Sequence, residues 1–127
     1  MNQLRSWKQY IPGHRVLLLF APRPSHRLYQ WQVEELLTDW DGLEERNVQV
    51  LHFYSKTREM DEPAIWTDQS AQEAFRQFKV SPNQFAFILI DKDGREKFRR
   101  EYPVELRAFF IIVDVMPSRK AELRDNS

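Results

Sequence analysis

Two arginines and a histidine stand close together at the start of the first predicted helix. Arg23, His26 and Arg27 follow an apolar stretch, 15–22, that has the composition of a buried strand ending at a proline. In open α/β sheets, functional groups gather at the carboxyl end of such a strand. His26 could donate or accept a proton, and the arginines with the helix N-terminus could bind an anion. The alternative is a solvated turn, because two prolines remove backbone donors there.

The residue types exclude thiol chemistry and give no support for a metal. The chain has no cysteine, which excludes disulfides, thiolate metal sites and thiol-based redox reactions. His14, His26 and His52 have no short metal-ligand spacing, so we expect no metal and no cofactor. Residues 91–94 resemble the start of a calcium loop, but the later ligands are missing and a hairpin turn is the simpler interpretation.

Three further residues are candidates for contacts with a partner. Trp66 lies in a long polar stretch, 55–69, and large aromatic side chains are common anchors of protein interfaces. Asp114 and Arg119 flank Pro117, which ends a predicted helix. They could form a recognition surface at the helix end, or Arg119 could pair with a nearby carboxylate as part of a helix stop. No residue is assigned a catalytic role.

Composition describes a globular chain without a strong charge. Hydrophobic residues make up 42% and charged residues 30% of the 127 positions, which favours a soluble domain with a real core. Lys+Arg and Asp+Glu both number 19, which argues against nucleic acid and leaves little charge repulsion against self-association. No apolar run is long enough to cross a membrane. The N-terminus lacks a signal core, so we expect a cytoplasmic protein as written, exported if an upstream signal precedes it.

Hydrophobic spacing in the first half of the chain predicts two strands separated by a helix. The strands cover 15–21 and 48–54 and are mostly apolar. The helix is expected to begin at the N-cap Ser25. Asp41-Gly42 ends or interrupts it, and Asn47 can take a left-handed conformation before the second strand. The apolar face of this predicted helix consists of Tyr29, Val33, Leu36, Leu37 and Trp40.

The second half predicts a helix, a hairpin and a closing helix. A capping box at Ser70 should open the first of these helices. An apolar strand over 85–90 and a return strand over 95–102 flank the turn at 91–94. Pro103 suits the first turn of a helix whose buried face would be Leu106, Phe109, Phe110 and Val113. A short charged helix or tail follows at 118–124.

The return strand has a basic side. Arg95, Lys97 and Arg99 share one parity of the strand, with Arg100 on the other. The basic side chains could hold an acidic partner, or they could protect an edge strand from pairing with other chains.

The predicted element order, β-α-β-α-β-β-α, is that of a thioredoxin-like core. We expect an α/β fold with a mixed four-stranded sheet in the order 2-1-3-4 and helices on both faces. The first strand is central and the hairpin strand beside it is antiparallel to it. We expect a single domain over 1–127, with a lead-in at 1–13 and a C-terminal tail at 118–127.

Four motifs in order resemble the uncharacterised bacterial family DUF4174, whose members are thioredoxin-like. The resemblance covers nearly the whole chain, and it implies a fold but no established activity. Related domains occur in animal sushi-repeat extracellular proteins. The motifs are Leu17-Leu-Leu-Phe-Ala-Pro22 with Tyr29 after it, Gly42-Leu-Glu-Glu-Arg46, Phe85–Gly94, and Val113-Asp-Val-Met-Pro-Ser-Arg119 with Glu122.

Departures from active thioredoxins bear most on function. The positions of an active Cys-x-x-Cys fall near Pro24 and Arg27, and Pro82 lies too early to be the usual cis-proline before the third strand. Disulfide exchange and thiol peroxidase activity are therefore excluded. We expect a redox-inactive protein-interaction module that binds a protein partner or its own copy. The alternative is a small-molecule or anion-binding protein, or a non-thiol enzyme, that uses the turn after the first strand.

Overall fold

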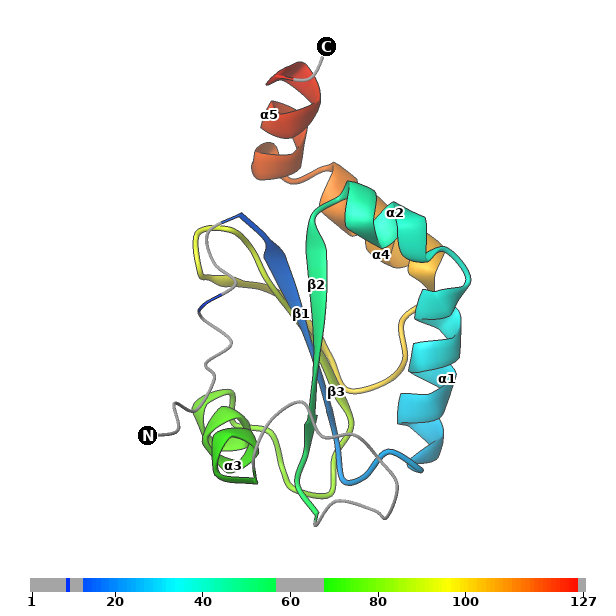
Figure 1. Cartoon of the computed structure of the whole chain (residues 1–127), viewed down its shortest axis with the longest axis vertical. Helices are drawn as coiled ribbons and strands as arrows, with labels where there is room; N and C mark the ends of the chain where they lie inside the picture. Colours follow the sequence, from blue (N-terminus) through cyan, green and yellow to red (C-terminus); the bar gives the residue numbers. More distant parts are fainter. Residues whose placement is uncertain (1–8, 10–12, 57–67, 126–127) are drawn as a thin grey trace.

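The computed structural model describes residues 9, 13–56 and 68–125. Trp66 and most of the lead-in lie outside the described residues. The elements run β1 (Arg15–Ala21), α1 (Arg27–Leu37), α2 (Trp40–Glu45), β2 (Val48–Tyr54), α3 (Asp68–Gln77), β3 (Ala86–Ile90), β4 (Glu96–Arg100), α4 (Leu106–Asp114) and α5 (Pro117–Asp125) (Figure 1).

The four strands form one mixed sheet in the order β2-β1-β3-β4, as predicted. β1 pairs parallel with β2, beginning with Arg15 opposite Val48, and antiparallel with β3. β4 returns antiparallel beside β3, after a turn in which Gly94 has a φ of 82°. A central strand must be covered on both faces, and β1 is accordingly buried along its whole length.

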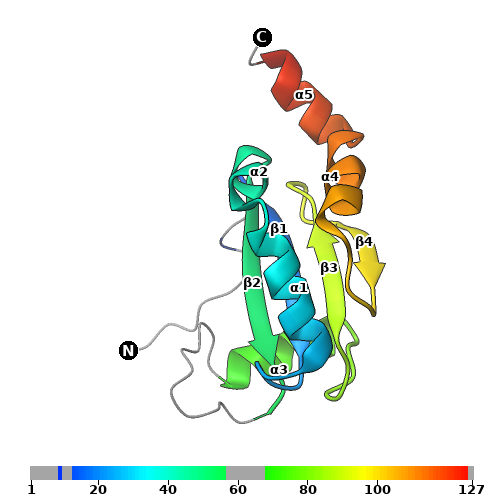
Figure 2. The same cartoon turned by 90° about the vertical axis from the view of Figure 1, so that its right-hand side faces the viewer.

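Helices cover the two faces of the sheet unequally. α1, α2 and α4 lie on one face and α3 lies on the other (Figures 1 and 2). Alternate residues of β1 supply the two cores, with Leu17 and Leu19 toward α1 and α4, and Leu18 and Phe20 toward α3. The α3 core is rich in aromatic contacts: the Phe20 ring centroid lies 5.2 Å from that of Phe53 and 4.9 Å from that of Phe75.

Helix boundaries differ from the sequence-based expectation in several places. His26, not Ser25, occupies the N-cap position of α1. Ser70 lies inside α3, which begins at Asp68, so the predicted capping box does not open that helix. α4 begins at Leu106 rather than at Pro103, because the preceding segment is held extended by hydrogen bonds between the backbone of Val104 and the side chain of Gln32.

The expected apolar face of α1 ends early. Tyr29 and Leu36 are buried and Val33 packs against the core, but Leu37 is 62% exposed. Trp40 belongs to the separate helix α2 and is 39% exposed. The chain turns between the two helices, where the Asp39 carboxylate accepts a hydrogen bond from the backbone N–H of Gly42 at 3.0 Å. The helical spacing of apolar residues does not continue past Asp39, because the chain begins a new helix at that N-cap.

A left-handed residue leads from α2 into β2. Asn47 has a φ of 57°, as its residue type predicted. Its backbone N–H binds the Glu44 carbonyl oxygen at 3.0 Å, and its own carbonyl oxygen accepts from the Arg15 N–H at 2.7 Å. The turn therefore aligns the first residues of β2 and β1.

Candidate functional site

The carboxyl end of β1 meets the start of α1 at a proline-bounded turn. Pro22 and Pro24 are buried, and Arg23 and Arg27 are exposed. The backbone N–H of His26 binds the Arg23 carbonyl oxygen at 3.1 Å, which closes the turn before the helix begins. The prolines fix the backbone while the two guanidinium groups remain available to solvent.

His26 lies in this turn with its ring half-buried. Its Nδ1 atom is buried, and it has no hydrogen-bond partner among the described residues. A buried ring nitrogen in that state can still accept or donate a hydrogen bond. Arg23, His26 and Arg27 therefore share one turn, as the sequence predicted.

Three side chains that sequence reasoning did not assign to the site meet beside this turn. The Tyr29 hydroxyl of α1 lies 2.8 Å from His52 Nδ1 and 2.7 Å from the Tyr54 hydroxyl. His52 and Tyr54 are two residues apart on β2, so they project from the same face of the sheet. The shared parity of His52 and Tyr54 on one strand is the signal that the sequence offers, and it does not show that Tyr29 of α1 meets them.

Electrostatics favour a neutral histidine in this cluster. Burial lowers the pKa of His52 from 6.5 to about 4. The neutral ring can therefore accept at Nδ1 while its proton stays on Nε2. A chain in which Tyr54 donates to Tyr29, and Tyr29 donates to His52, satisfies both short contacts with the single proton of each hydroxyl.

A hollow of about 340 Å³ opens next to the tyrosine pair. Its lining combines a proline and a valine with two tyrosines, a glutamine and a glutamate, and this mixture suits recognition of a polar side chain on a larger molecule. Its lining consists of Pro24, Tyr29, Gln30, Val33, Glu34 and Tyr54.

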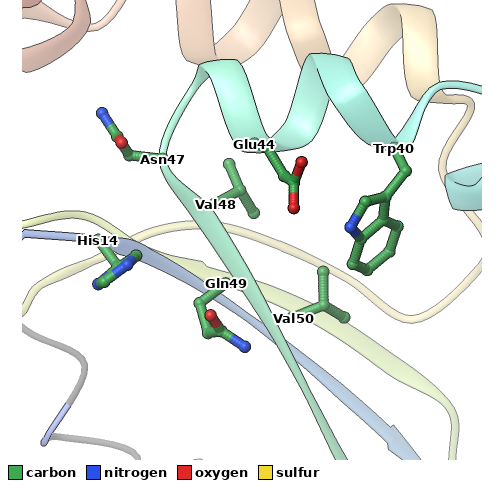
Figure 3. Close-up of a pocket in the computed structure, with 7 residues that line it drawn as sticks. All are labelled: His14, Trp40, Glu44, Asn47, Val48, Gln49 and Val50. Atoms are coloured by element: carbon green, nitrogen blue, oxygen red, sulfur yellow. The ribbon is translucent and has the colours of Figure 1, made fainter.

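A second hollow, of about 310 Å³, lies at the amino end of β2 (Figure 3). Trp40 and Glu44 of α2 overhang it, and Val48, Gln49 and Val50 form its floor. It is therefore separate from the hollow beside the turn. Among the described residues, no group of three or more His, Asp or Glu side chains is placed to hold a metal ion.

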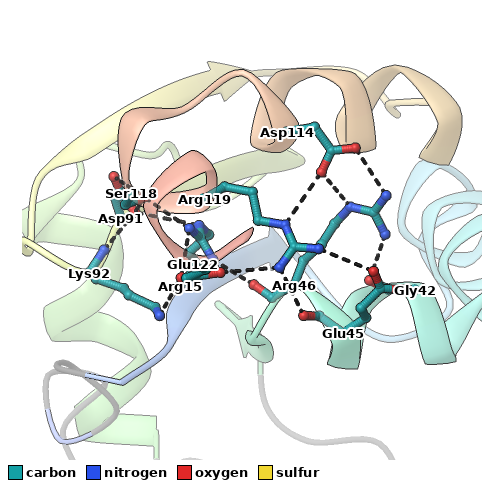
Figure 4. A network of polar contacts seen from close by, with 10 residues as sticks. All are labelled: Arg15, Gly42, Glu45, Arg46, Asp91, Lys92, Asp114, Ser118, Arg119 and Glu122. Atoms are coloured by element: carbon teal, nitrogen blue, oxygen red, sulfur yellow. Dashed lines mark hydrogen bonds and ion pairs between the residues drawn. The ribbon is translucent and has the colours of Figure 1, made fainter. Parts of the chain in front are cut away.

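Asp114 and Arg119 lie at the other end of the sheet from Arg23, His26 and Arg27. Arg119 is 4% exposed. Its guanidinium lies 3.1 Å from the Glu45 carboxylate, 3.7 Å from that of Asp114 and 3.2 Å from that of Glu122 (Figure 4). Asp114 also receives two hydrogen bonds from Arg46, at 2.9 and 3.0 Å. These contacts join α2, α4 and α5.

Arg15 connects the same network to the first residue of β1. Its side chain is fully buried, and it contacts the carboxylates of Asp91 at 3.5 Å and Glu122 at 3.0 Å. It also donates to the Arg46 carbonyl oxygen at 2.6 Å and to the Ser118 hydroxyl at 2.9 Å. The basic residue that opens β1 thus lies at the centre of the ionic contacts.

The return strand β4 uses part of its positive charge locally. Arg99 binds Glu96 at 2.9 and 3.1 Å and the Phe78 carbonyl oxygen at 2.7 Å, and Lys97 pairs with Asp93 at 3.1 Å. β4 is an edge strand, as predicted. Four of its five residues are charged, namely Glu96, Lys97, Arg99 and Arg100.

Sequence comparison connects the chain to one family and to longer animal proteins. The family model described as "Domain of unknown function (DUF4174)" matches residues 6–122. The human sushi repeat-containing protein SRPX2 is 29% identical over 109 residues, which cover 84% of this chain and 23% of that protein. The Xenopus laevis protein of the same name is 26% identical over 111 residues. The chain thus spans about a quarter of the length of these relatives.

Solved structures with the same fold include peroxiredoxins and thioredoxin domains. The reduced 2-Cys peroxiredoxin of Plasmodium vivax superposes with a TM-score of 0.70 at 18% identity, covering 91% of this chain and 84% of that one. The thioredoxin domain of a Bacteroides vulgatus thiol-disulfide oxidoreductase has a TM-score of 0.64 at 12% identity, covering 85% and 81%. At these identities the likeness establishes a thioredoxin-like fold. Among the described helices, none is long and apolar enough to cross a membrane.

Proposed function

The chain belongs to the DUF4174 family, and from this premise we propose that residues 1–127 form one thioredoxin-like domain that acts by binding another protein. One observation carries the proposal. At the carboxyl end of β1, where active thioredoxins carry thiols, this chain has no cysteine near Pro24 and Arg27, yet a hollow lined by Tyr29 and Tyr54 lies beside them. This hollow supports a recognition role that needs no thiol.

The lining of this hollow suggests the kind of partner. Pro24 and Val33 can contact an aliphatic chain, and the Glu34 carboxylate can accept hydrogen bonds from a cationic end. An exposed lysine or arginine on a partner protein combines both properties. Arg23 and Arg27, exposed at the turn, would then contact an acidic neighbour of that residue. We propose Trp66 as an additional contact with the partner protein.

Asp114 and Arg119 have a different place in this proposal. Their ionic contacts hold α4 and α5 together at the far end of the sheet, and Arg119 is almost inaccessible. We assign them to positioning these helices, with the exposed part of Asp114 open to a partner.

Selection from a displayed random peptide library tests the partner class. We expect peptides with a lysine or arginine next to an acidic residue to be enriched on the wild type. Glu34→Gln should lose this enrichment, because the carboxylate that accepts from the cation is gone. Glu73→Gln, an exposed change of the same type on α3, should keep it. Equal enrichment on both variants, or catalytic disulfide or peroxide reduction by the wild type, would overturn the proposal.

A second candidate function is the binding of a small anion or metabolite at the turn. It is favoured by the buried, unpartnered Nδ1 of His26 between two exposed arginines. A non-thiol enzyme using His26 as acid or base would belong to the same candidate.

Native mass spectrometry of the protein purified from its host, followed by calorimetry with inorganic phosphate, tests this second function. A retained small molecule, or phosphate binding that His26→Ala removes without unfolding, would support it. A bare chain that does not bind phosphate would favour the protein-binding proposal.

A further inference from the structure

β2 forms one edge of the sheet. Within the described part of the chain, it pairs with β1 on one side and with no strand on the other. The two edges differ in chemistry. β4 has the sequence EKFRR and is therefore protected by charge, whereas β2 reads VQVLHFY and carries no charged residue. An uncharged edge strand is a template for pairing with another strand.

The backbone groups that point outward can be identified. The Asn47 carbonyl oxygen and the Ser55 N–H both bind β1. Because the direction of the backbone groups alternates along a strand, residues of odd number between them also face β1. The N–H and C=O groups of the even-numbered residues therefore face away from the sheet. These residues are Val48, Val50, His52 and Tyr54.

The hollow of Figure 3 lies on this outer edge. Its lining includes Val48 and Val50, whose side chains pack in the α1 core, and Gln49, whose position in the strand directs it to the other face. Because residues on both faces of β2 line this hollow, the hollow includes the outer edge of β2. Trp40, which is 39% exposed, provides an apolar wall for a strand that pairs there.

Charges of opposite sign flank the two ends of β2. At the amino end, the exposed α2 residues Asp41 and Glu44 are acidic, and Glu44 lines the hollow. At the carboxyl end, exposed Lys56 follows the strand. If a second copy of β2 paired antiparallel with the first, the basic end of each strand would lie beside the acidic end of the other. The favourable charge contact would therefore occur at both ends of the pair. This self-complementarity is what a two-fold interface requires.

We propose that β2 pairs antiparallel with β2 of a second copy, across a two-fold axis at Leu51, and so joins two four-stranded sheets into one of eight strands. In this register Val48 is opposite Tyr54 of the second copy, and Val50 is opposite His52. Val50 and His52 of each copy then exchange hydrogen bonds with His52 and Val50 of the other. Glu44 of each copy lies beside Lys56 of the other. The equal numbers of acidic and basic residues leave no net charge to oppose the contact.

Charge reversal with sedimentation equilibrium tests this arrangement. The wild type should sediment as a dimer of twice 15.4 kDa. Glu44→Lys and Lys56→Glu should each raise the dissociation constant of the dimer roughly ten-fold, because each places like charges together at both symmetry-related contacts. The double variant should return to within about three-fold of the wild type. Glu73→Lys, which changes net charge equally on exposed α3, is the matched control and should leave dimerisation unchanged.

Proline substitution provides a second, independent variant. The N–H of Val50 faces outward, so Val50→Pro removes a donor to the second copy while leaving the bonds between β2 and β1 intact. We expect a folded monomer by circular dichroism and sedimentation. Should this variant unfold, hydrogen exchange of the wild type replaces it, and the Val50 and His52 amides should be protected increasingly at higher protein concentration.

Three outcomes would overturn the proposal. They are a wild type that stays monomeric at millimolar concentration, a dimer that neither charge reversal weakens, and a double variant as weak as the single variants. A dimer that resists charge reversal, or a double variant that is not restored, would mean that the copies associate through another surface. A monomeric wild type would mean that the edge of β2 binds a partner protein or another segment of this chain.

Discussion

Arg15 and Glu122 are 107 positions apart in the sequence, yet Arg15 Nη2 lies 3.0 Å from Glu122 Oε2. The contact joins the first residue of the central strand to α5. Among the residues of α5, only Arg119 is buried, so the helix has little apolar surface with which to pack. Charge pairs and hydrogen bonds therefore determine where α5 lies.

Replacement of Arg15 by methionine should destabilise the protein strongly. The change would leave the buried Asp91 carboxylate without its Arg15 partner and would remove one of the cations that contact Glu122. Loss of one partner of a buried ion pair costs about 3–5 kcal/mol. Urea unfolding followed by circular dichroism would measure this loss. Lys120→Met, an exposed change on α5, should alter the free energy of unfolding by less than about 0.5 kcal/mol. Equal effects of the two changes would contradict the central role of Arg15.

Acid should weaken the attachment of α5 between pH 4.5 and about 2. Burial alone would raise the pKa of Glu122, but hydrogen bonds from Lys92, Arg15 and Arg119 outweigh it and lower the pKa from 4.5 to about 2. The folded-state pKa is depressed, so this stabilisation is complete above pH 4.5 and is lost as the pH falls to about 2. Glu122→Gln should be less stable than the wild type at pH 7 and equal to it near pH 2. A constant difference across this range in urea titrations would be incompatible with this assignment.

His52 should produce a separate acid effect at higher pH. Burial lowers its folded-state pKa from 6.5 to about 4, so between these values the unfolded chain binds a proton that the folded protein does not. Its contribution to stability is therefore complete above pH 6.5 and falls as the pH drops toward 4. His52→Gln should flatten the stability curve in this window alone. NMR titration of the ring should give a midpoint near pH 4 in the wild type, and a midpoint near 6.5 would refute burial as the cause.

Gly42→Ala should destabilise the protein although alanine favours helices. An added Cβ would lie 2.7 Å from Phe110 Cζ and 2.7 Å from Asp39 Oδ2. Such overpacking costs about 1–3 kcal/mol, which exceeds the gain of about 1 kcal/mol in helix propensity. Thermal unfolding should therefore show a lower Tm. In a Phe110→Leu background the same substitution should cost less, and an undiminished cost would place the clash elsewhere.

Local patterns in the sequence were sufficient to predict the strands and their order. The apolar runs of β1, β2 and β3 and the Asp-Gly turn at 93–94 each depend on neighbouring residues, and together they define the β2-β1-β3-β4 sheet. Asn47 was predicted to be left-handed for the same local reason. The sequence did not predict the start of α4, because Gln32, which is far away in the sequence, holds Val104 in an extended segment.

The candidate site was only partly accessible to sequence reasoning. The turn that carries Arg23, His26 and Arg27 follows from the end of β1 and from two prolines. The contact of Tyr29 with His52 and Tyr54 depends on how α1 lies across β2, and spacing along the chain does not give that orientation. The same limit applies to Arg119, whose three carboxylate partners come from α2, α4 and its own helix.

The two ends of β1 have different tolerance to mutation. At the amino end, the fully buried Arg15 is tied to so many partners that few replacements are compatible with folding. At the carboxyl end, Arg23 and Arg27 are exposed on a backbone already fixed by prolines. Side chains at that end can therefore change without endangering the scaffold. A saturation library at the exposed positions Arg23, Arg27, Gln30 and Glu34 should yield many folded variants with altered binding. This tolerance makes the domain a practical starting point for the design of new binding proteins.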